Sequence, residues 1–411
     1  MPDLRHCRVL VLDDEPFMLK LLSHMLRRQG CEQVTCHDSG AAALAWMDEA
    51  GQMPELILLD INMPGMDGIE FVRHLSQRSF SGGLVLVSGE DELLLQSTEK
   101  LARAHRLSTM APLRKPPKPE ALAAALAQWA APAVGRQTGQ RKSYDAADLR
   151  RALDTGELIN YYQPKVAVAS GALVGVEALV RWQHPVDGLV FPDQFIPVAE
   201  ASGLIHELTR QVFRAALAQA RDWMLAGLSL RVAVNVSMED LATLQLADFV
   251  IAETAASGVP AQLIQLEITE SRLMSELTRV LDELIRLRLK RFRLSIDDFG
   301  SGHSSLVQLR DLPFDELKID RSFTHNASHD ARVRAIFEGS LGIGKLLGME
   351  VVAEGVEDSD DWGFLGATGC DIAQGYFIGR PMPGPQLLHW LQEWKARVWQ
   401  DRLVVRPESP P

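Results

Sequence analysis

The feature that most constrains this chain is a repeated alternation of short apolar runs with longer amphipathic stretches. Such alternation is typical of strand–helix units arranged around a parallel sheet. With 411 residues the chain exceeds one ordinary core, so we expect two domains. Hydrophobic residues make up 46% and charged residues 23%, which is the balance of a folded globular protein.

The first domain is expected over residues 1–130. Its strand candidates are Arg8–Leu12, Gln33–His37, Leu56–Asp60, Leu84–Ser88 and Thr109–Arg114. These strands with intervening helices predict a doubly wound, flavodoxin-like α/β fold whose ligands bind at the carboxyl ends of the strands. Residues 131–143 lose the periodicity and contain proline and glycine, so they are expected to form a linker.

The second domain is expected over residues 144–400, with a tail at residues 401–411. Its strand candidates are Leu173–Val180, Arg231–Val236, Leu263–Ile268, Arg293–Asp297, Glu316–Asp320, Met349–Ala353 and Ile372–Phe377. Most of them alternate with helical segments. Roughly 250 residues of this pattern predict a TIM-type (β/α)8 barrel, in which functional residues gather at the carboxyl ends of the strands.

Charge and cysteine content restrict the partners and the compartment. A formal net charge of -12 argues against binding to DNA or to an anionic membrane. The cysteines lack metal-ligand spacing, and no apolar run approaches the length of a membrane span. We therefore expect a cytoplasmic protein with no DNA or membrane partner.

Polar residues close the strands of the first domain. These residues are Asp13, Asp14, Asp60, Ser88 and Lys115. An aspartate at a strand end is often only a helix cap, but five such residues at one sheet edge favour a site. Clustered carboxylates without histidine favour Mg²⁺, which would draw a phosphate donor onto Asp60. Ser88 and Lys115 would then bind the phosphoryl oxygens.

The first domain resembles the response regulator receiver domain. The resemblance rests on Asp13-Asp14-Glu15-Pro16, Leu58–Gly68, Val87-Ser88-Gly89 and Arg114-Lys115-Pro116. It implies that Asp60 is the phosphoacceptor, that Asp13, Asp14 and Asp60 surround Mg²⁺ with the Asn62 backbone carbonyl, and that Ser88 and Lys115 bind the phosphoryl group. It also implies a sensor histidine kinase or phosphotransfer protein as partner.

This chain departs from the receiver pattern at Pro112, which stands where the family often carries an aromatic switch residue. Proline has no ring that can swing inward, so the usual aromatic relay is not expected. The departure does not affect the residues that handle the phosphoryl group.

Polar residues also lie at or near the ends of the apolar runs of the second domain. They are Glu177, Asn235, Glu267, Asp297, Asp298, Lys318, Glu354 and Gln374. In a barrel these run ends converge on one mouth. For either pair alone the simpler interpretation is favoured, namely a turn at Asp297-Asp298 and a surface pair of Lys318 with Asp320. The complete set is harder to dismiss, because buried strand ends tolerate acids only when metals or partners satisfy them.

The oxygen ligands in this set suit Mg²⁺ or Mn²⁺. Glu177, Asn235, Glu267 and Asp297 can hold one ion, and the adjacent Asp298 lets a second ion share Asp297. Two such ions are typical of sites that cleave phosphate esters.

The second domain resembles the EAL-domain cyclic di-GMP phosphodiesterases. The matching motifs are Tyr161–Lys165, Glu177–Trp182, Asn235-Val236-Ser237, Leu266–Glu270, Asp297–Gly300, Leu317–Asp320, Ala353–Glu357 and Gln374-Gly375-Tyr376. The resemblance implies that Glu177, Asn235, Glu267 and Asp297 bind one metal and that Asp297 and Asp298 serve a second. Cyclic di-GMP would be the substrate and linear pGpG the product.

The resemblance also implies roles around the reacting water and the substrate. Lys318 would hold the attacking water, and Glu354 would act as general base or orient that water. Gln163 and Arg181 would contact the dinucleotide, and Gln374 would support the site. The family's flexible loop corresponds to Asp298–Leu306, with Glu270 as its anchor and His303 in place of the usual tyrosine.

Together these features predict a response regulator in which phosphorylation of Asp60 controls a phosphodiesterase. Two alternatives remain: a catalytically silent receptor for cyclic di-GMP, and a sink for phosphoryl groups that acts through the receiver domain alone. No Gly-Gly-Asp/Glu-Glu-Phe cyclase signature is present. A homo-oligomer is also expected.

Overall fold

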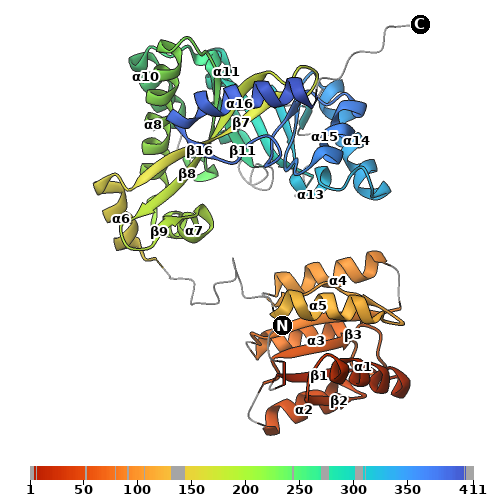
Figure 1. Ribbon diagram of the computed structural model, residues 1–411. Coiled ribbons are helices and arrows are strands. Elements are labelled where there is room, and N and C mark those ends of the chain that lie inside the picture. Colours follow the sequence, from red (N-terminus) through yellow and green to blue (C-terminus); the bar gives the residue numbers. More distant parts are fainter. Residues whose placement is uncertain are drawn as a thin grey trace, which may run out of the picture. The chain divides into compact units, whose positions relative to one another are not determined.

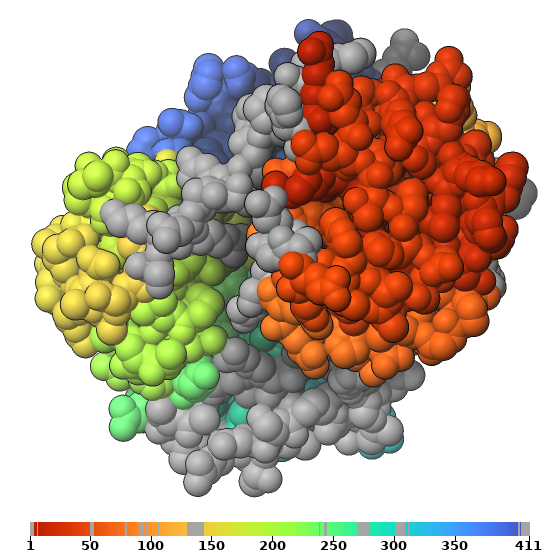
Figure 2. Space-filling view, turned by 90° about the horizontal axis from the view of Figure 1, so that it is seen from below, coloured from red at the N-terminus to blue at the C-terminus, as the bar shows by residue number. Residues whose placement is uncertain are grey.

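The structure is a computed structural model that describes residues 4–5, 7–50, 53–78, 80–89, 92–105, 107–130, 144–242, 245–269, 277–300, 309–310, 312–401 and 403. The chain separates into two compact units, Met1–Arg141 and Lys142–Pro411 (Figure 1). Figure 2 shows residues of the first unit in red to orange and residues of the second in yellow to blue. The expected linker at residues 131–143 lies outside the described residues, so the domain boundaries remain a prediction.

The first unit is a parallel sheet flanked by helices, as expected. Its strands are β1 (Arg8–Leu12), β2 (Gln33–His37), β3 (Leu56–Asp60), β4 (Gly83–Ser88), β5 (Ser108–Thr109) and β6 (Leu113–Arg114). Its helices are α1 (Pro16–Arg28), α2 (Gly40–Ala50), α3 (Gly68–Gln77), α4 (Glu92–Ala104) and α5 (Pro119–Ala130). The strand order is β2-β1-β3-β4-β5, with β6 also paired to β4. This order confirms the doubly wound fold.

Both faces of this sheet are buried. Leu10 and Leu12 of β1 belong to one apolar cluster, whereas Val9 and Val11 belong to another. Successive side chains of a strand point to opposite faces, so the two clusters lie on the two sides of the sheet. An almost continuous apolar run is therefore required of each central strand.

The fifth strand was predicted as one segment, Thr109–Arg114, and this prediction is wrong. The structure has two short strands there, β5 and β6, with Pro112 between them. Proline cannot donate a hydrogen bond to a neighbouring strand, so it interrupts the ladder. The chain returns to β4 where the Lys115 amide donates to the Ser88 carbonyl at 2.8 Å.

The second unit contains a closed barrel of eight strands. They are β7 (Leu158–Ala167), β8 (Leu173–His184), β10 (Arg231–Asn235), β11 (Ile264–Thr269), β12 (Arg293–Phe299), β13 (Glu316–Ile319), β14 (Glu350–Ala353) and β15 (Ile372–Ala373). Neighbouring strands pair in the order β7-β15-β14-β13-β12-β11-β10-β8, and the β8–β7 pairing closes the ring. The expected (β/α)8 barrel is confirmed.

One strand of the barrel runs against the others. β7 is antiparallel to both of its neighbours, β8 and β15. The strand candidates from the sequence did not include β7, although its residues Tyr161–Lys165 were singled out as a motif. Two short strands, β9 (Gly188–Val190) and β16 (Met382–Pro383), pair outside the ring with β8 and β7.

Helices surround the barrel (Figure 1). They are α6 (Ala146–Thr155), α7 (Pro192–Ser202), α8 (Ile205–Leu225), α9 (Met238–Ala242), α10 (Leu246–Ser257), α11 (Leu277–Leu289), α13 (Arg321–Thr324), α14 (Ala331–Leu346), α15 (Ser359–Thr368) and α16 (Leu387–Gln400), with short 3₁₀ turns η1 (Ala261–Leu263) and η3 (Gly384–Gln386). No helix among the described residues is long and apolar enough to cross a membrane.

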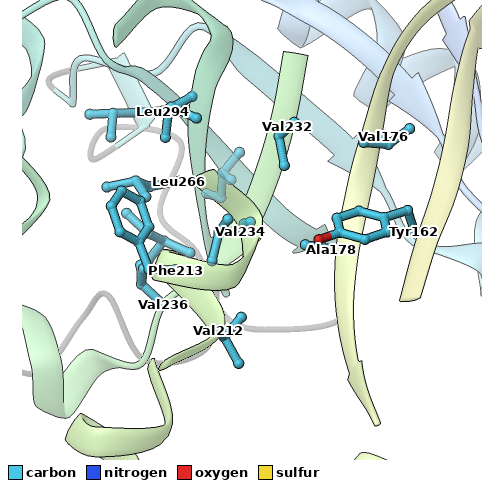
Figure 3. Packing of buried hydrophobic residues seen from close by; sticks show 14 of the residues in the cluster. Tyr162, Val176, Ala178, Val212, Phe213, Val232, Val234, Val236, Leu266 and Leu294 are labelled. Carbon is cyan, nitrogen blue, oxygen red and sulfur yellow. The ribbon is translucent and has the colours of Figure 1, made fainter. Parts of the chain in front are cut away.

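Side chains alternate between the outside and the inside of the barrel. Val232 and Val234 of β10 join Leu266, Leu294 and Phe213 in one apolar cluster with the surrounding helices (Figure 3). On β11 and β12 the residues between the apolar positions are polar and point into the barrel, as the period of two requires, whereas β10 has Ala233 at this position. This alternation places the site residues inside the ring.

Candidate functional site

The first unit gathers its predicted site residues around Lys115. The Lys115 Nζ atom lies 2.8 Å from Asp13 Oδ2 and 2.7 Å from Asp60 Oδ2. Carboxylate oxygens of Asp13, Asp14 and Asp60 lie within 4.8 Å of one another. The Asn62 amide donates to Asp60 Oδ1 at 3.2 Å. An all-oxygen cluster at the carboxyl ends of β1 and β3 fits a hard divalent cation.

Burial and hydrogen bonding have opposite effects on the pKa values of the residues in this cluster. Burial raises the pKa of Asp60, whereas the hydrogen bond from Lys115 lowers it, and the net shift is upward. Burial alone would lower the pKa of Lys115, but hydrogen bonds to Asp13 and Asp60 outweigh it and raise that pKa. Ser88 ends β4 and is also buried. The ammonium group of Lys115 therefore stays charged beside Asp60.

In the second unit, four carboxylates surround the ammonium group of Lys318. The Lys318 Nζ atom lies 2.7 Å from Glu354 Oε1, 2.9 Å from Glu267 Oε2, 2.9 Å from Asp297 Oδ1 and 3.4 Å from Glu177 Oε2. The side chain of Lys318 is only 1% exposed. Acids that outnumber the nearby cation leave the mouth of the barrel negatively charged, which favours the binding of further cations.

Amides complete the ring around Glu177. Asn235 Nδ2 donates to Glu177 Oε1 at 2.8 Å, and Gln374 Nε2 donates to Glu177 Oε2 at 2.6 Å. Gln374 Nε2 also lies 3.1 Å from Gln163 Oε1. The Gln374 Oε1 atom is buried without a hydrogen-bond partner among the described residues. It is an acceptor that a bound ligand or water could satisfy.

Two acid groups at the mouth share Asp297. One consists of Glu177, Glu267 and Asp297, and the other of Asp297, Asp298 and Glu354. Within each group the candidate ligand oxygens lie within 4.8 Å of one another. Asp298 has a φ of 56°, a left-handed conformation that aspartate tolerates better than most residues. Oxygen donors in two groups with one shared member fit a pair of Mg²⁺ or Mn²⁺ ions.

Crowding of the acids shifts their pKa values. Burial, followed by the repulsion of Glu177, raises the pKa of Glu267 to about 7. Burial and the charge of Asp297 raise the pKa of Asp298 to about 6. Burial also raises the pKa of Glu354 well above its usual value, against the opposing effect of Lys318. Shifted acids in a cleft are typical of functional sites.

A cavity of about 210 Å³ opens beside these acids. It is lined by residues that include Gln163, Glu177, Glu354 and Gln374, together with Arg321 and Tyr376. The guanidinium group of Arg181 instead packs against two aromatic rings, with its carbon 5.2 Å from the centre of Phe191 and 6.0 Å from that of Tyr161. Gln163 and Gln374 therefore reach the cavity, as their predicted substrate-binding roles require.

The expected loop of the second domain is only partly described. Asp298, Phe299 and Gly300 are described, whereas His303 and the rest of residues 301–308 lie outside the described residues. The expected anchor, Glu270, also lies outside them. Its role remains a prediction.

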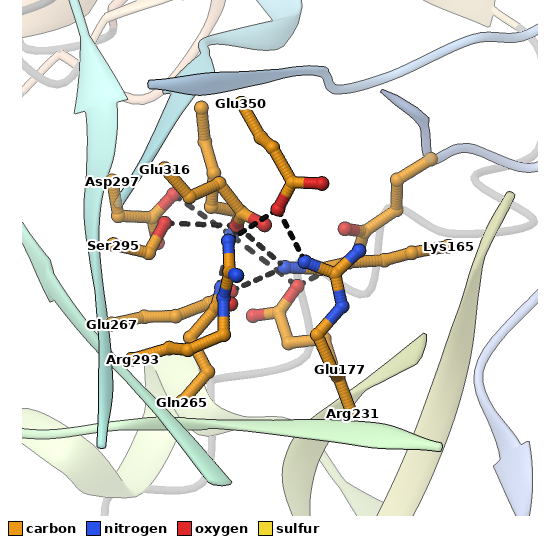
Figure 4. A network of polar contacts seen from close by, with 12 residues as sticks. Lys165, Glu177, Arg231, Gln265, Glu267, Arg293, Ser295, Asp297, Glu316 and Glu350 are labelled. Atoms are coloured by element: carbon orange, nitrogen blue, oxygen red, sulfur yellow. Dashed lines mark hydrogen bonds and ion pairs between the residues drawn. The ribbon is translucent and has the colours of Figure 1, made fainter. Parts of the chain in front are cut away.

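A second set of polar residues inside the barrel was not predicted from the sequence. Lys165, Gln265, Ser295 and Glu316 are buried and contact one another below the rim (Figure 4). A signal for most of them was present, because Gln265, Ser295 and Glu316 each precede a rim residue by two positions. That spacing places both residues on the same face of a strand.

Fold and sites define a class of protein in which a doubly wound domain with an acidic sheet edge precedes a barrel with an acidic mouth. Residues 9–127 match the response regulator receiver domain, and residues 146–381 match the EAL domain. The chain belongs to the EAL domain family and carries a receiver domain before its EAL domain.

Individual relatives share this organisation or its second half. The cyclic di-GMP phosphodiesterase RocR of Pseudomonas aeruginosa is 34% identical over 93% of this chain and 98% of RocR. The bifunctional diguanylate cyclase/cyclic di-GMP phosphodiesterase MucR of the same species is 42% identical over 59% of this chain but only 35% of MucR. A solved structure of the PaMucR phosphodiesterase with c-di-GMP is 41% identical, covers 59% of this chain and 98% of that chain, and has a TM-score of 0.57.

Proposed function

We propose that the EAL domain of this cyclic di-GMP phosphodiesterase converts its substrate to linear pGpG with two divalent ions, and that phosphorylation of Asp60 controls the reaction. The observation that carries the first part is the pair of acid groups that share Asp297 at the mouth of the barrel. RocR, which is similar over nearly the whole chain, bears the same activity in its name.

Glu177, Asn235, Glu267 and Asp297 would hold one ion, and Asp297 with Asp298 would hold the other. When bound, such ions activate water and stabilise the charge that develops on the phosphoryl oxygens. The water oxygen forms a bond to phosphorus, and the P–O3′ bond breaks. This leaves a 5′-phosphate and a free 3′-hydroxyl in the linear product.

Two residues of this chain would handle the proton and the water. Glu354 would accept the proton of the attacking water, and burial raises the pKa of its carboxyl well above the usual value, which makes the carboxylate a stronger base. Lys318 lies 2.7 Å from Glu354 Oε1 and would orient the same water through its ammonium group. Gln163, Gln374 and Arg181 would bind the dinucleotide, and Arg181 has a planar group suited to a phosphate.

Hydrolysis by the purified full-length protein tests this proposal. Cyclic di-GMP is incubated with Mg²⁺ or Mn²⁺, and the products are separated by chromatography. We expect pGpG, and we expect its formation to stop when a chelator removes the metal or when Glu177 is replaced in Glu177→Ala. Binding of cyclic di-GMP without turnover would instead indicate a silent receptor.

Control by phosphorylation is supported by the site in the first unit. Asp60 is buried, Lys115 Nζ lies between it and Asp13, and the grouped oxygens of Asp13, Asp14 and Asp60 support a role for Asp60 as phosphoacceptor beside a cation. A sensor histidine kinase or a phosphotransfer protein would supply the phosphoryl group. We propose that the signal reaches the EAL domain through the Asp298–Leu306 loop with Glu270 as anchor. A homo-oligomer and a cytoplasmic location remain predictions.

A small phosphodonor tests the regulatory part. Turnover of the wild type should change after treatment, whereas Asp60→Ala should keep its untreated rate. Glu270→Ala should weaken or remove the response. If Asp60→Ala responded like the wild type, phosphorylation of Asp60 would not be the controlling event. An effect in cells that survives Glu177→Ala but not Asp60→Ala would indicate a phosphoryl sink.

A further inference from the structure

A second polar layer lies inside the barrel, directly below the acids of the mouth (Figure 4). It consists of Lys165 from β7, Gln265 from β11, Ser295 from β12 and Glu316 from β13. All four side chains are buried. Buried polar groups need partners, so the contacts of this layer indicate what it supports.

Lys165 connects the two layers. Its Nζ atom lies 2.5 Å from Glu267 Oε1 in the upper layer and 3.2 Å from Glu316 Oε1 in its own layer. The other oxygen of Glu267, Oε2, lies 2.9 Å from Lys318 Nζ. Each carboxylate oxygen of Glu267 is therefore held by a different lysine, one from below and one from the side of the mouth.

Glu316 fixes Lys165 in turn. Its Oε1 atom accepts hydrogen bonds from Gln265 Nε2 at 2.6 Å and from Ser295 Oγ at 2.9 Å. These two donors come from the strands that also carry the acids of the mouth. Lys165 and Glu316 carry opposite charges, so the lower layer adds no net charge beneath Glu267.

We propose that Lys165 is a positioning residue that orients Glu267 for metal binding, and that Glu316 holds Lys165 in place. The inference rests on the proposed two-metal function and assigns Lys165 as the residue that orients one of the metal ligands, Glu267. With Oε1 occupied by Lys165, Oε2 is the atom of Glu267 that turns toward the mouth. Partners of this kind keep a carboxylate in one orientation, and their loss typically weakens metal affinity about 10–100-fold.

Lys165 lies far from its target in the sequence. It is separated from Glu267 by 102 residues, and the pairing of β7 with β8 and β15 brings it into the ring. A motif search around each metal ligand would not find it. The structure shows the link because the long aliphatic side chain of lysine crosses the interior of the barrel.

The test compares metal binding by full-length variants without substrate. Lys165→Met combined with Glu316→Gln removes the lysine and its counter-charge together, so Glu316 is not left charged and unpaired. Arg293→Met combined with Glu350→Gln makes the same kind of change one layer lower, where both Arg231 and Arg293 contact Glu350. Titration calorimetry with Mn²⁺ alone gives the affinity, and thermal melting shows whether each variant folds.

We expect the Lys165/Glu316 variant to bind Mn²⁺ about 10–100-fold more weakly than the wild type, whereas the Arg293/Glu350 control keeps wild-type affinity. Equal weakening in both variants would overturn the proposal, because it would indicate a general loss of barrel packing. Wild-type affinity in a folded Lys165/Glu316 variant would also overturn it.

If the Lys165/Glu316 double variant does not fold, a single variant tests the positioning role of Lys165. Glu316→Gln alone keeps the size of the side chain and loosens Lys165, so Mn²⁺ affinity should fall by less than in the double variant. Unchanged affinity in folded Glu316→Gln would overturn the proposal. Failure of the wild type to bind Mn²⁺ would contradict the two-metal function itself, which separates that result from failure of the positioning role alone.

Discussion

Each unit of this protein gathers acids around a single lysine, but the two clusters differ in enclosure. In the first unit Lys115 contacts Asp13 and Asp60 at a sheet edge, and its side chain is 12% exposed. In the second unit Lys318 contacts four carboxylates inside a closed ring, and its side chain is 1% exposed. Lys115 is therefore the more accessible of the two lysines, although Asp13 and Asp60 beside it are buried.

The largest expected effect concerns Glu354, the residue proposed to accept the proton. Glu354→Gln should lower kcat by about 10²–10⁴-fold, because it removes a base while keeping the size of the side chain. Binding of cyclic di-GMP should change little. Steady-state kinetics and a direct binding titration measure the two quantities, and near-normal kcat would contradict the role of Glu354.

Replacement of the cation is expected to have the next largest effect. Ca²⁺ prefers longer bonds and a looser coordination shell than Mg²⁺, so it should bind the acids yet support little hydrolysis. Rates with Mg²⁺, Mn²⁺ and Ca²⁺ at equal saturation provide the comparison. Equal rates in Ca²⁺ would exclude the two-ion mechanism.

The enclosed cluster should also show a pH dependence. The pKa of Glu267 is raised to about 7 and that of Asp298 to about 6, so both carboxyls take up protons as the pH falls through this range. Protons then compete with the metal, and the rate should fall as the pH is lowered. Raising the Mn²⁺ concentration should move this loss to lower pH. A pH profile that does not respond to Mn²⁺ would contradict such competition.

The smallest expected effect concerns the cluster around Asp60 and Lys115. Phosphodonor treatment should change turnover of the wild type only a fewfold, because a shift of about 1 kcal/mol between two arrangements changes their ratio by less than tenfold. Asp60→Ala should remove this response and keep the untreated rate. Measurement of turnover with and without phosphodonor in both proteins would show whether the cluster around Asp60 controls the cluster around Lys318.

The sequence predicted the bounds of β1, β2 and β3 well, but it predicted β15 too long and did not predict β7. The bounds of β1, β2 and β3 agree with the predicted ranges, and β1 and β3 are short apolar runs between polar segments. The predicted strand Ile372–Phe377 is confined to Ile372–Ala373, since the chain bends after Ala373 and the Val356 amide donates to the Gln374 carbonyl at 3.1 Å. β7 was missed because its apolar residues do not form one continuous run.

The site could be predicted as far as its acids lie at strand ends. Glu267 and Asp297 come together as the barrel rule implies, since the carboxyl ends of parallel strands share one rim, and Glu177 joins them from within the longer strand β8. Lys165 escaped this rule because β7 runs in the opposite direction and brings its side chain in below the rim. Tertiary pairing, rather than local pattern, decides where that residue lies.

The antiparallel strand β7 also sets an order of events during folding. It pairs with β8 next to it in the sequence, but its other partner is β15, where Val166 lies opposite Ala373. A nascent chain can form the hairpin early, whereas the ring closes only after almost the whole second domain has been synthesised. Such long-range closure is slow because the chain loses conformational entropy when the loop closes, before the contacts between β7 and β15 can stabilise the structure. Until then the edges of the barrel sheet stay open to pairing with other chains.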